Sequence, residues 1–251
     1  MTFLILSGPT REYLDPVRFI SNESSGKMGT ALAKQALKKG AKVIFISGPA
    51  PVKPERKLSK KLKIIDVVSA GEMFAALKKN FKKADIVIGA AAVSDFKPVS
   101  LKKQKIKKGS GRTAITFDKN PDIIAYCGKN KKKQVVAGFA LETEKLLKNA
   151  AKKLKEKNLD MIVANGRQSL GSDKTTVYLI TNNMDSVSAV SFRRKPESIL
   201  SVSSNKLKGN VDTGFRRYDN LGFSKKQGSK NKIAGKIIDE TIGIFKRIKA
   251  C

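Results

Sequence analysis

Residues Ser7 to Gly29 read SGPTREYLDPVRFISNESSGKMG. The apolar run Phe3–Leu6 leads into this polar loop as a strand, and the pattern of a helix follows it. A loop that ends where a helix starts directs backbone N–H groups at one point, and the helix dipole makes that point favourable for an anion. The stretch therefore predicts a phosphate group near the first helix. The expected phosphate loop consists of Ser24, Ser25, Gly26, Lys27, Met28 and Gly29.

Strands and helices alternate along most of the chain. Short apolar runs predict strands at residues 3–6, 42–46, 64–68, 85–88, 134–139, 161–164 and 176–180. Helical spacing predicts helices at 27–39, around 73–81, at 122–128, 144–157 and 230–249. Continuous apolar strands between helices are typical of a mostly parallel sheet that is covered on both faces. We therefore expect an α/β, Rossmann-like fold in a single domain over 1–251, with ligands at the carboxyl ends of the strands.

The composition excludes several kinds of chemistry. The 251 residues include no histidine, which rules out histidine-based nucleophile pairs and histidine metal sites. The two cysteines, Cys127 and Cys251, cannot form a disulfide framework, and no spacing of metal ligands is present. We therefore predict no metal held by the protein itself.

The net charge of +31 makes a basic nucleic-acid-binding α/β module one alternative. The lysines are spread through the chain, however, and the 6% of aromatic residues do not alternate with basic ones in a base-stacking pattern. The distribution favours solvated surface lysines, and we expect no specific nucleic-acid partner.

No apolar run approaches the ~18–20 residues that span a bilayer. The N-terminal MTFLILSG enters a strand and a glycine turn rather than a basic and then apolar leader. A cytoplasmic location without a membrane partner is the expectation.

The stretch from Ser186 to Gly222 interrupts the alternation of strands and helices. It is rich in serine, arginine and asparagine and has no sustained hydrophobic period. We expect a long loop or a disordered insertion at 186–222, without chemistry of its own.

Two other nucleotide sites fit the first loop less well. A dinucleotide site in a nicotinamide-dependent reductase needs G-x-G-x-x-G, but Gly8 is followed by no glycine before Gly26, and the second strand ends without an acidic residue for the ribose. A P-loop needs an earlier glycine and a hydroxyl after the lysine, which Gly26-Lys27-Met28 lacks. The reductase remains a second alternative.

Nucleotide-driven activation of a carboxylate fits the remaining segments. Small residues at 89–92 allow a ring or a sugar close to the backbone, and Asp95 can accept hydrogen bonds. The basic, glycine-bearing segment 105–111 predicts a mobile flap over phosphates. Asn120 is the expected N-cap of a helix with Pro121 in its first turn, and Lys153 and Lys157 are expected to share a helix face. A triphosphate supplies its own leaving group, so such a site needs no histidine.

The same segments, in the same order, resemble the phosphopantothenate–cysteine ligase family. The most specific motifs are DPVR-F-ISN-E-SSGKMG at 15–29, AAVSD at 91–95, KIKK at 105–108, KNPDI at 119–123, GFALET at 138–143 and KNLD at 157–160. The resemblance implies that cytidylate passes from CTP to the carboxylate of 4′-phosphopantothenate with loss of pyrophosphate. The amine of cysteine then displaces CMP and gives 4′-phosphopantothenoylcysteine.

The resemblance also implies residue roles. Asn22 would hold the acyl-cytidylate, Arg18 would face an anion, and Lys105 would stabilise charge during activation. Ala91 and Ala92 would line the pantothenate region. The residues expected to border the cytidine are Asp95, Asn120, Pro121, Asp122, Ile123 and Phe139, and those expected to face the triphosphate are Lys153 and Lys157.

Members of this family often carry a flavin-binding decarboxylase before the ligase domain. The first strand here begins at Phe3, so the resemblance implies a stand-alone ligase, or a ligase half with a separate decarboxylase partner. It further implies a homodimer and magnesium that accompanies the CTP.

Overall fold

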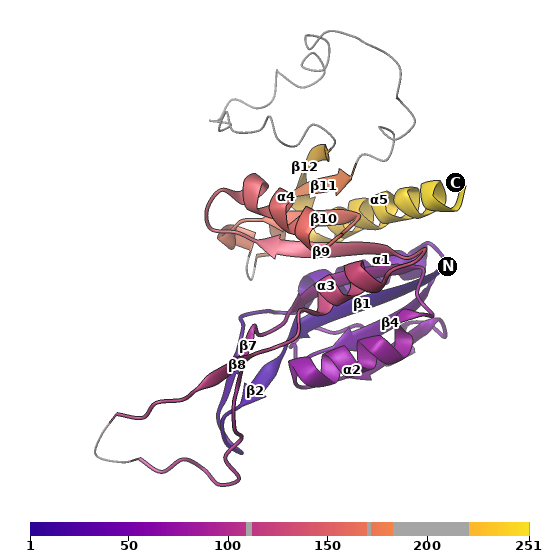
Figure 1. Cartoon of the computed structure of the whole chain (residues 1–251). Helices are drawn as coiled ribbons and strands as arrows, with labels where there is room; N and C mark the ends of the chain where they lie inside the picture. The colour runs from indigo at the N-terminus through magenta and orange to yellow at the C-terminus, as the bar shows by residue number, and fades with distance from the viewer. Residues whose placement is uncertain (109–111, 170–171, 183–220, 251) are drawn as a thin grey trace.

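The computed structural model describes residues 1–108, 112–169, 172–182 and 221–250. Its centre is an eight-stranded sheet in the order β12-β11-β10-β9-β6-β1-β4-β5 (Figure 1). The strands of this sheet are β1 (Thr2–Pro9), β4 (Lys42–Ser47), β5 (Leu62–Asp66), β6 (Ile86–Ala92), β9 (Val135–Leu141), β10 (Met161–Asn165), β11 (Lys174–Asn182) and β12 (Leu221–Ser229). The six strands from β10 to β5 run parallel, and β11 and β12 pair antiparallel at one edge. The predicted mostly parallel α/β sheet is confirmed.

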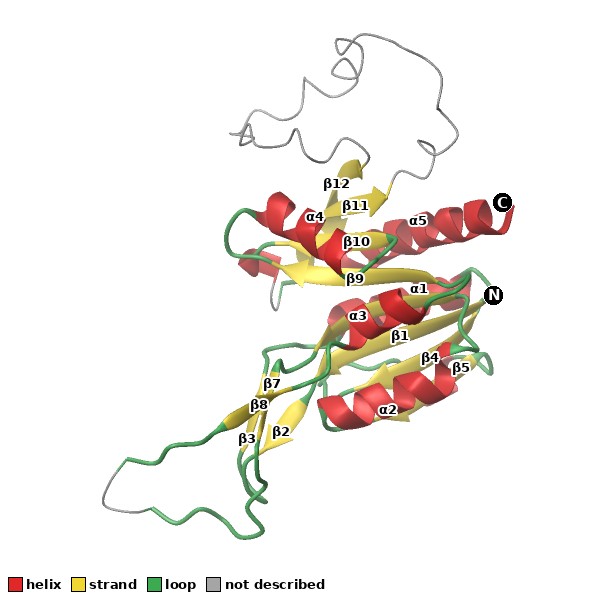
Figure 2. Cartoon of the chain, in the orientation of Figure 1, coloured by secondary structure: helices red, strands yellow, loops and turns green. Residues whose placement is uncertain are grey.

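Helices cover both faces of this sheet (Figure 2). Helices α1 (Lys27–Lys38) and α5 (Lys230–Ala250) pack on one face, where Phe3, Phe45 and Ile237 are fully buried. Helices α2 (Ala70–Phe81), α3 (Ile123–Asn130) and α4 (Leu146–Glu156) pack on the other face, around Leu4, Met73 and related side chains. Because both faces are buried, the central strands read as continuous apolar runs, which is why the sequence predicts them. Two short 3-10 helices lie at Arg56–Leu58 and Arg167–Ser169.

Two small hairpins extend from the carboxyl edge of the sheet (Figures 1 and 2). The first pairs β2 (Arg11–Tyr13) with β3 (Phe19–Ser21), and the second pairs β7 (Phe96–Pro98) with β8 (Phe117–Lys119). The basic segment predicted as a flap belongs to the loop between β7 and β8. Its residues 105–108 form neither helix nor strand, and 109–111 lie outside the described residues, so its mobility stays a prediction.

The predicted insertion at 186–222 falls almost entirely outside the described residues. Its last two residues, Leu221 and Gly222, begin β12, so the predicted boundary is wrong at that end. No sequence pattern predicts strand β12. This strand lies at the sheet edge and alternates between half-buried and exposed residues, and it contains no apolar run to mark it.

In the described ranges, no helix combines the length and the apolar character that a bilayer crossing requires.

Candidate functional site

The carboxyl ends of β1 and β6 lie side by side at the centre of the sheet. Their parallel register places Gly8 beside Ala91 and Pro9 beside Ala92. Both alanines are half-buried, and the chain leaves the sheet directly after them. Small side chains at this edge leave the backbone open to a close approach by a ligand.

The expected phosphate loop precedes α1 at the same edge. Gly26 is the N-cap residue and has a left-handed backbone with φ 74°, and no side chain caps the helix. A Cβ at Gly26 would lie 2.4 Å from the carbonyl oxygen of Val52, so only glycine fits between this loop and the segment after β4. The uncapped N–H groups and the helix dipole make the start of α1 suitable for an anion.

Gly29 lets the first turn of α1 approach β1 closely. A Cβ there would meet the Oγ atom of Ser7 at 2.1 Å. Helix α1 therefore lies directly over the end of β1, and its N-terminus is held at the strand ends.

Lys27 of the loop forms an ion pair that the sequence did not predict. Its Nζ atom lies 2.7 Å from Oδ1 of Asp173, which precedes β11. The hydrogen bond and charge of Lys27 hold the pKa of Asp173 below its ordinary value. Burial and the nearby charge of Lys27 lower the pKa of Lys230, at the start of α5, while Asp173 opposes that shift. Two lysines thus share one carboxylate beside the loop.

Asn22 lies at the base of the first hairpin and contacts the end of β6. Its Nδ2 donates to the carbonyl oxygen of Val93 at 3.0 Å, and the residue is exposed. Nearby, the N–H of Ser94 donates to Oγ1 of buried Thr10 at 3.0 Å. Ser21 donates to the carbonyl oxygen of Thr10 at 2.7 Å. These bonds fix Asn22 beside the turn that carries Asp95.

Asn120 joins this group from the loop before α3. Its Nδ2 donates to the carbonyl oxygen of Ser94 at 3.0 Å, and its backbone N–H donates to the carbonyl oxygen of Asp95 at 2.8 Å. The prediction of Asn120 as the helix N-cap is therefore wrong, because its side chain makes this tertiary contact instead. Asp122 is the N-cap, and it accepts from the N–H of Ala125 at 3.0 Å.

The other residues expected near the cytidine differ in exposure. Pro121 is exposed, Ile123 is buried as the first residue of α3, and Phe139 is half-buried on β9. Phe139 also packs against the core on the face of α1 and α5.

Both lysines expected at the triphosphate form ion pairs. Lys153 on α4 lies 2.6 Å from Glu142, whose side chain is 12% exposed. Lys157, the residue just after α4, lies 2.7 Å from Asp122. Each charge is thus neutralised within the fold.

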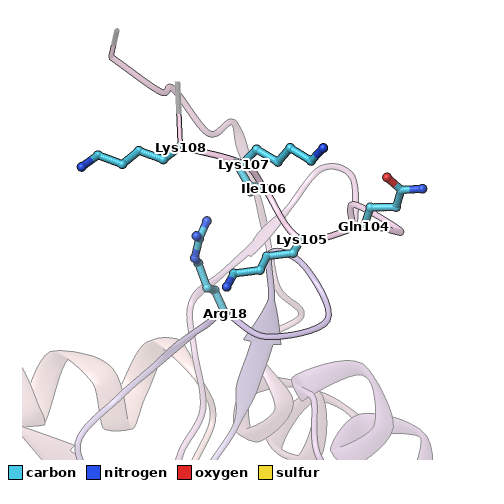
Figure 3. A pocket seen from close by; sticks show the side chains of 6 residues that line it. All are labelled: Arg18, Gln104, Lys105, Ile106, Lys107 and Lys108. Atoms are coloured by element: carbon cyan, nitrogen blue, oxygen red, sulfur yellow. The ribbon is translucent and has the colours of Figure 1, made fainter. Parts of the chain in front are cut away.

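Arg18 and Lys105 meet at the tip of the first hairpin. They line an open cavity of about 480 Å³ together with Gln104, Ile106, Lys107 and Lys108. Figure 3 shows that Lys105 extends toward Arg18, whereas Lys107 and Lys108 point apart. We call Arg18, Lys105, Lys107 and Lys108 the tip cations. Among the described residues, the one carboxylate within ion-pair distance of these four is that of Asp15, 3.5 Å from Arg18.

Some of the predicted site residues form two groups, which do not include Phe139, Lys153 or Lys157. Asn22, the 91–95 turn and Asn120 are connected by hydrogen bonds at the sheet edge, beside the phosphate loop. The tip cations lie further along the hairpin, because Arg18 precedes Ser21 by three residues of extended chain, roughly 10 Å. No local pattern in the sequence marks Asp173 or Lys230 as site residues, and Asp15 stands there only as part of the DPVR motif.

Two curated relatives match most of this chain. A protein named cysteine/cysteine sulfinic acid decarboxylase, from an unknown prokaryotic organism, is 47% identical over 188 residues, which cover 72% of this chain and 52% of the relative. The coenzyme A biosynthesis bifunctional protein CoaBC of Borreliella burgdorferi is 45% identical over 180 residues, which cover 70% and 45%. The chain spans about half the length of these relatives.

Two solved structures are similar to this chain in fold. The C-terminal domain of a coenzyme A biosynthesis bifunctional protein CoaBC superposes with a TM-score of 0.70 at 28% identity, covering 100% of this chain and 96% of that one. A Cab2 variant in complex with phosphopantothenate-cysteine superposes with a TM-score of 0.71 at 19% identity, covering 99% and 87%. At 19% identity the second likeness shows the fold alone.

The sequence profile of one family extends over both groups of site residues, from the first strand through the flap to β11, matching residues 1–203. This chain therefore belongs to the DNA/pantothenate metabolism flavoprotein C-terminal domain family.

Proposed function

We propose that this chain is a ligase that joins 4′-phosphopantothenate to L-cysteine and uses CTP to activate the carboxylate. A carboxylate oxygen of phosphopantothenate attacks the α-phosphorus of CTP, and pyrophosphate leaves. The nitrogen of cysteine then attacks the acyl carbon, an amide bond forms, a proton is lost and CMP leaves. The carrying observation is the hydrogen-bonded group of Asn22, Ser94 and Asn120 beside an uncapped helix start. The family and the coenzyme A biosynthesis relatives support the same reaction.

The phosphate loop is the proposed site for phosphate oxygens. The backbone N–H groups in the first turn of α1, which no N-cap side chain accepts, supply neutral donors, and Lys27 and Lys230 supply charge close by. The cytidine would lie over Asp95, Asn120, Pro121, Asp122, Ile123 and Phe139. Lys153 and Lys157 would add positive potential near the triphosphate, although each is already paired.

The reacting carboxylate would lie beside Asn22, with the pantothenate chain along Ala91 and Ala92. An amide can donate to one oxygen of the acyl-cytidylate while its own oxygen orients the amine of cysteine. Arg18 and Lys105 would stabilise negative charge during activation, because they carry more positive charge than Asp15 neutralises.

The tip cations and Asn22 are separated by the length of the hairpin, and a homodimer would bring the tip of one chain toward another molecule. Large apolar side chains on the two hairpins are exposed, which supports such an interface: they are Val17, Phe19, Ile20, Phe96, Val99, Leu101, Ile115 and Phe117. We propose that a second copy of this chain covers them. Sedimentation of the wild type and of Phe96→Asp tests this, because a monomeric wild type contradicts the dimer.

Magnesium is proposed as part of the CTP complex rather than as a resident ion. Within the described ranges, no group of three or more histidine, cysteine, aspartate or glutamate side chains could hold a metal. These residues therefore do not fit a metal site made of protein ligands alone.

The proposed functional partner is a flavin-dependent decarboxylase, on the same chain or a separate one. It would consume the product of the ligation rather than supply a substrate for it.

Release of pyrophosphate from CTP tests the proposal most directly. The chain is incubated with CTP, magnesium and 4′-phosphopantothenate, without cysteine. We expect a burst of pyrophosphate and an acyl-cytidylate that converts to the amide when cysteine is added. Absence of pyrophosphate with CTP, ATP, GTP and UTP alike contradicts the activation scheme.

A further inference from the structure

The tip of the first hairpin is attached to the loop between β7 and β8 by two hydrogen bonds, one of them within the basic segment. The N–H of Lys102 donates to the carbonyl oxygen of Leu14 at 3.0 Å. The N–H of Ile106 donates to Oδ2 of Asp15 at 3.0 Å. Ile106 directly follows Lys105 in the chain, so the second bond fixes the backbone next to that lysine.

Asp15 makes this bond from a fully buried position, since its side chain has 0% exposure. Its Oδ1 accepts from the N–H groups of Val17 and Arg18, each at 2.8 Å. Its Oδ2 also lies 3.5 Å from Nη1 of Arg18. One carboxylate thus shapes the turn that carries Arg18 and holds the residue next to Lys105.

The charge on this carboxylate is compensated by its neighbours. Burial acts to raise the pKa of Asp15, but the hydrogen bonds from Ile106, Val17 and Arg18 and the charge of Arg18 together hold it below its ordinary value. An ionised carboxylate accepts N–H groups at both oxygens, whereas a neutral carboxamide of the same size has one acceptor oxygen and an NH₂ group that only donates.

We propose that Asp15 is a positioning residue that sets Lys105 beside Arg18, so that both cations face one anion. Nothing in the proposed reaction requires Asp15 to touch the substrate. The contribution to activation rests on the proposed function, whereas the attachment of the basic segment by Asp15 does not.

Hydrogen exchange of the Asp15→Asn variant tests the attachment. The carboxamide offers a single acceptor oxygen and turns an N–H toward a backbone N–H, so one of the three backbone bonds must break. Loss of a hydrogen bond to a charged group should speed amide exchange in residues 102–108 by about tenfold to hundredfold. Unchanged exchange in this peptide overturns the proposal.

Asp160→Asn is the matched control. Asp160 accepts a hydrogen bond from the N–H of Val136 at 2.8 Å and pairs with Lys131 at 2.6 Å. It directly precedes β10, so it lies at the amino ends of the strands, away from the hairpins at their carboxyl ends. Its loss should lower the thermal midpoint without changing exchange in residues 102–108. An equal change of that peptide in both variants would show general loosening and would contradict a specific role for Asp15.

A double-mutant cycle tests the link to Lys105. In the pyrophosphate assay at saturating CTP, Asp15→Asn should slow release at least about tenfold, and Asp15→Asn with Lys105→Ala should be no slower than Lys105→Ala alone. Losses that multiply would show that Asp15 acts independently of Lys105, which overturns the positioning role.

Ile106→Pro removes the same hydrogen bond from the other partner and serves if Asp15→Asn does not fold. It should slow pyrophosphate release in the wild-type background and add nothing to Lys105→Ala. Full release by Ile106→Pro overturns the proposal. If the wild type releases no pyrophosphate with any nucleotide, the proposed function fails, and hydrogen exchange still decides whether Asp15 attaches the segment.

Discussion

The cations of this site differ in how the fold neutralises them. Lys153 and Lys157 each lie within 2.7 Å of a carboxylate, and each of these pairs joins α4 to another segment. Among the described residues, only one of the four tip cations, Arg18, lies within ion-pair distance of a carboxylate, that of Asp15 at 3.5 Å. Lys153 and Lys157 therefore complete internal charge pairs, whereas the tip cations have charge left for an external anion.

This difference supports a catalytic role of Lys105 more strongly than its position in the sequence does. A lysine in a chain with 52 lysines and arginines has no distinction by type. What separates Lys105 from most of them is its place in a cavity beside Arg18, on a segment attached through a buried carboxylate. Substitution of an unpaired tip cation should therefore reduce activity more than substitution of Lys153 or Lys157.

Lys105→Ala should have the largest effect. Removal of one group that stabilises developing negative charge costs about 2.7–4 kcal/mol, or roughly a hundredfold to a thousandfold in rate. The measurement is single-turnover release of pyrophosphate from CTP. Lys103→Ala is the control, since Lys103 is exposed and lies outside the cavity of the tip cations. Equal losses in the two variants would mean that general positive potential, not Lys105, drives activation.

Asn22→Asp should separate the two chemical steps. The carboxylate cannot donate to the carbonyl oxygen of Val93, nor to the acyl oxygen in the proposed intermediate. Pyrophosphate release should persist while transfer to cysteine slows about a hundredfold. Quench-flow with labelled phosphopantothenate measures the accumulated acyl-cytidylate. Loss of both steps together would show that Asn22 serves activation as well.

Gly26→Ala should destabilise the phosphate loop more than a comparable change elsewhere. A left-handed backbone costs a non-glycine residue about 1–2 kcal/mol. Gly40→Ala carries that cost alone, because its φ is 77° and nothing lies within 4 Å of the added Cβ. At Gly26, with φ 74°, the Cβ would also lie 2.7 Å from that of Ala50. Urea unfolding should show a larger loss for Gly26→Ala; equal losses would contradict the tight packing of this loop.

Within the described residues, the sequence predicted the parallel strands and the five α-helices, because local apolar patterns mark most of them. Strand β1 is buried from Phe3 to Pro9, and the register to β4 and β6 follows from packing on both faces. Strands β2, β3, β7, β8 and β12 are short or half-exposed, so the local pattern is weak and they were missed. Local apolar patterns in the sequence predict the sheet and helix layers of this fold, but they do not predict its two small hairpins.

The site residues illustrate the same limit. Asn120 and Asp122 are both good cap residues, and only the contact between Asn120 and Ser94, across 26 positions, decides which of them caps α3. The pair of Lys27 with Asp173 spans 146 positions, and the bond from Ile106 to Asp15 spans 91. Motif spacing identifies residues that share a role, whereas such long-range pairs become visible only when the chain is folded.

Lys153→Ala should have the smallest effect on activity. It tests the same comparison at a cation that the fold already pairs with a carboxylate. Glu142 already neutralises this lysine, so binding a triphosphate would compete with an existing ion pair. We expect less than about a tenfold rise in the KM for CTP and little change in kcat, whereas stability should fall by about 1–3 kcal/mol because the largely buried Glu142 carboxylate loses its partner. Steady-state kinetics and thermal unfolding measure these quantities. The Glu142→Gln variant is the matched control, because it frees the lysine and should strengthen CTP binding if Lys153 faces the triphosphate. A hundredfold loss of kcat in Lys153→Ala would show that a paired cation can carry the chemistry, and the distinction between the two groups of cations would then fail.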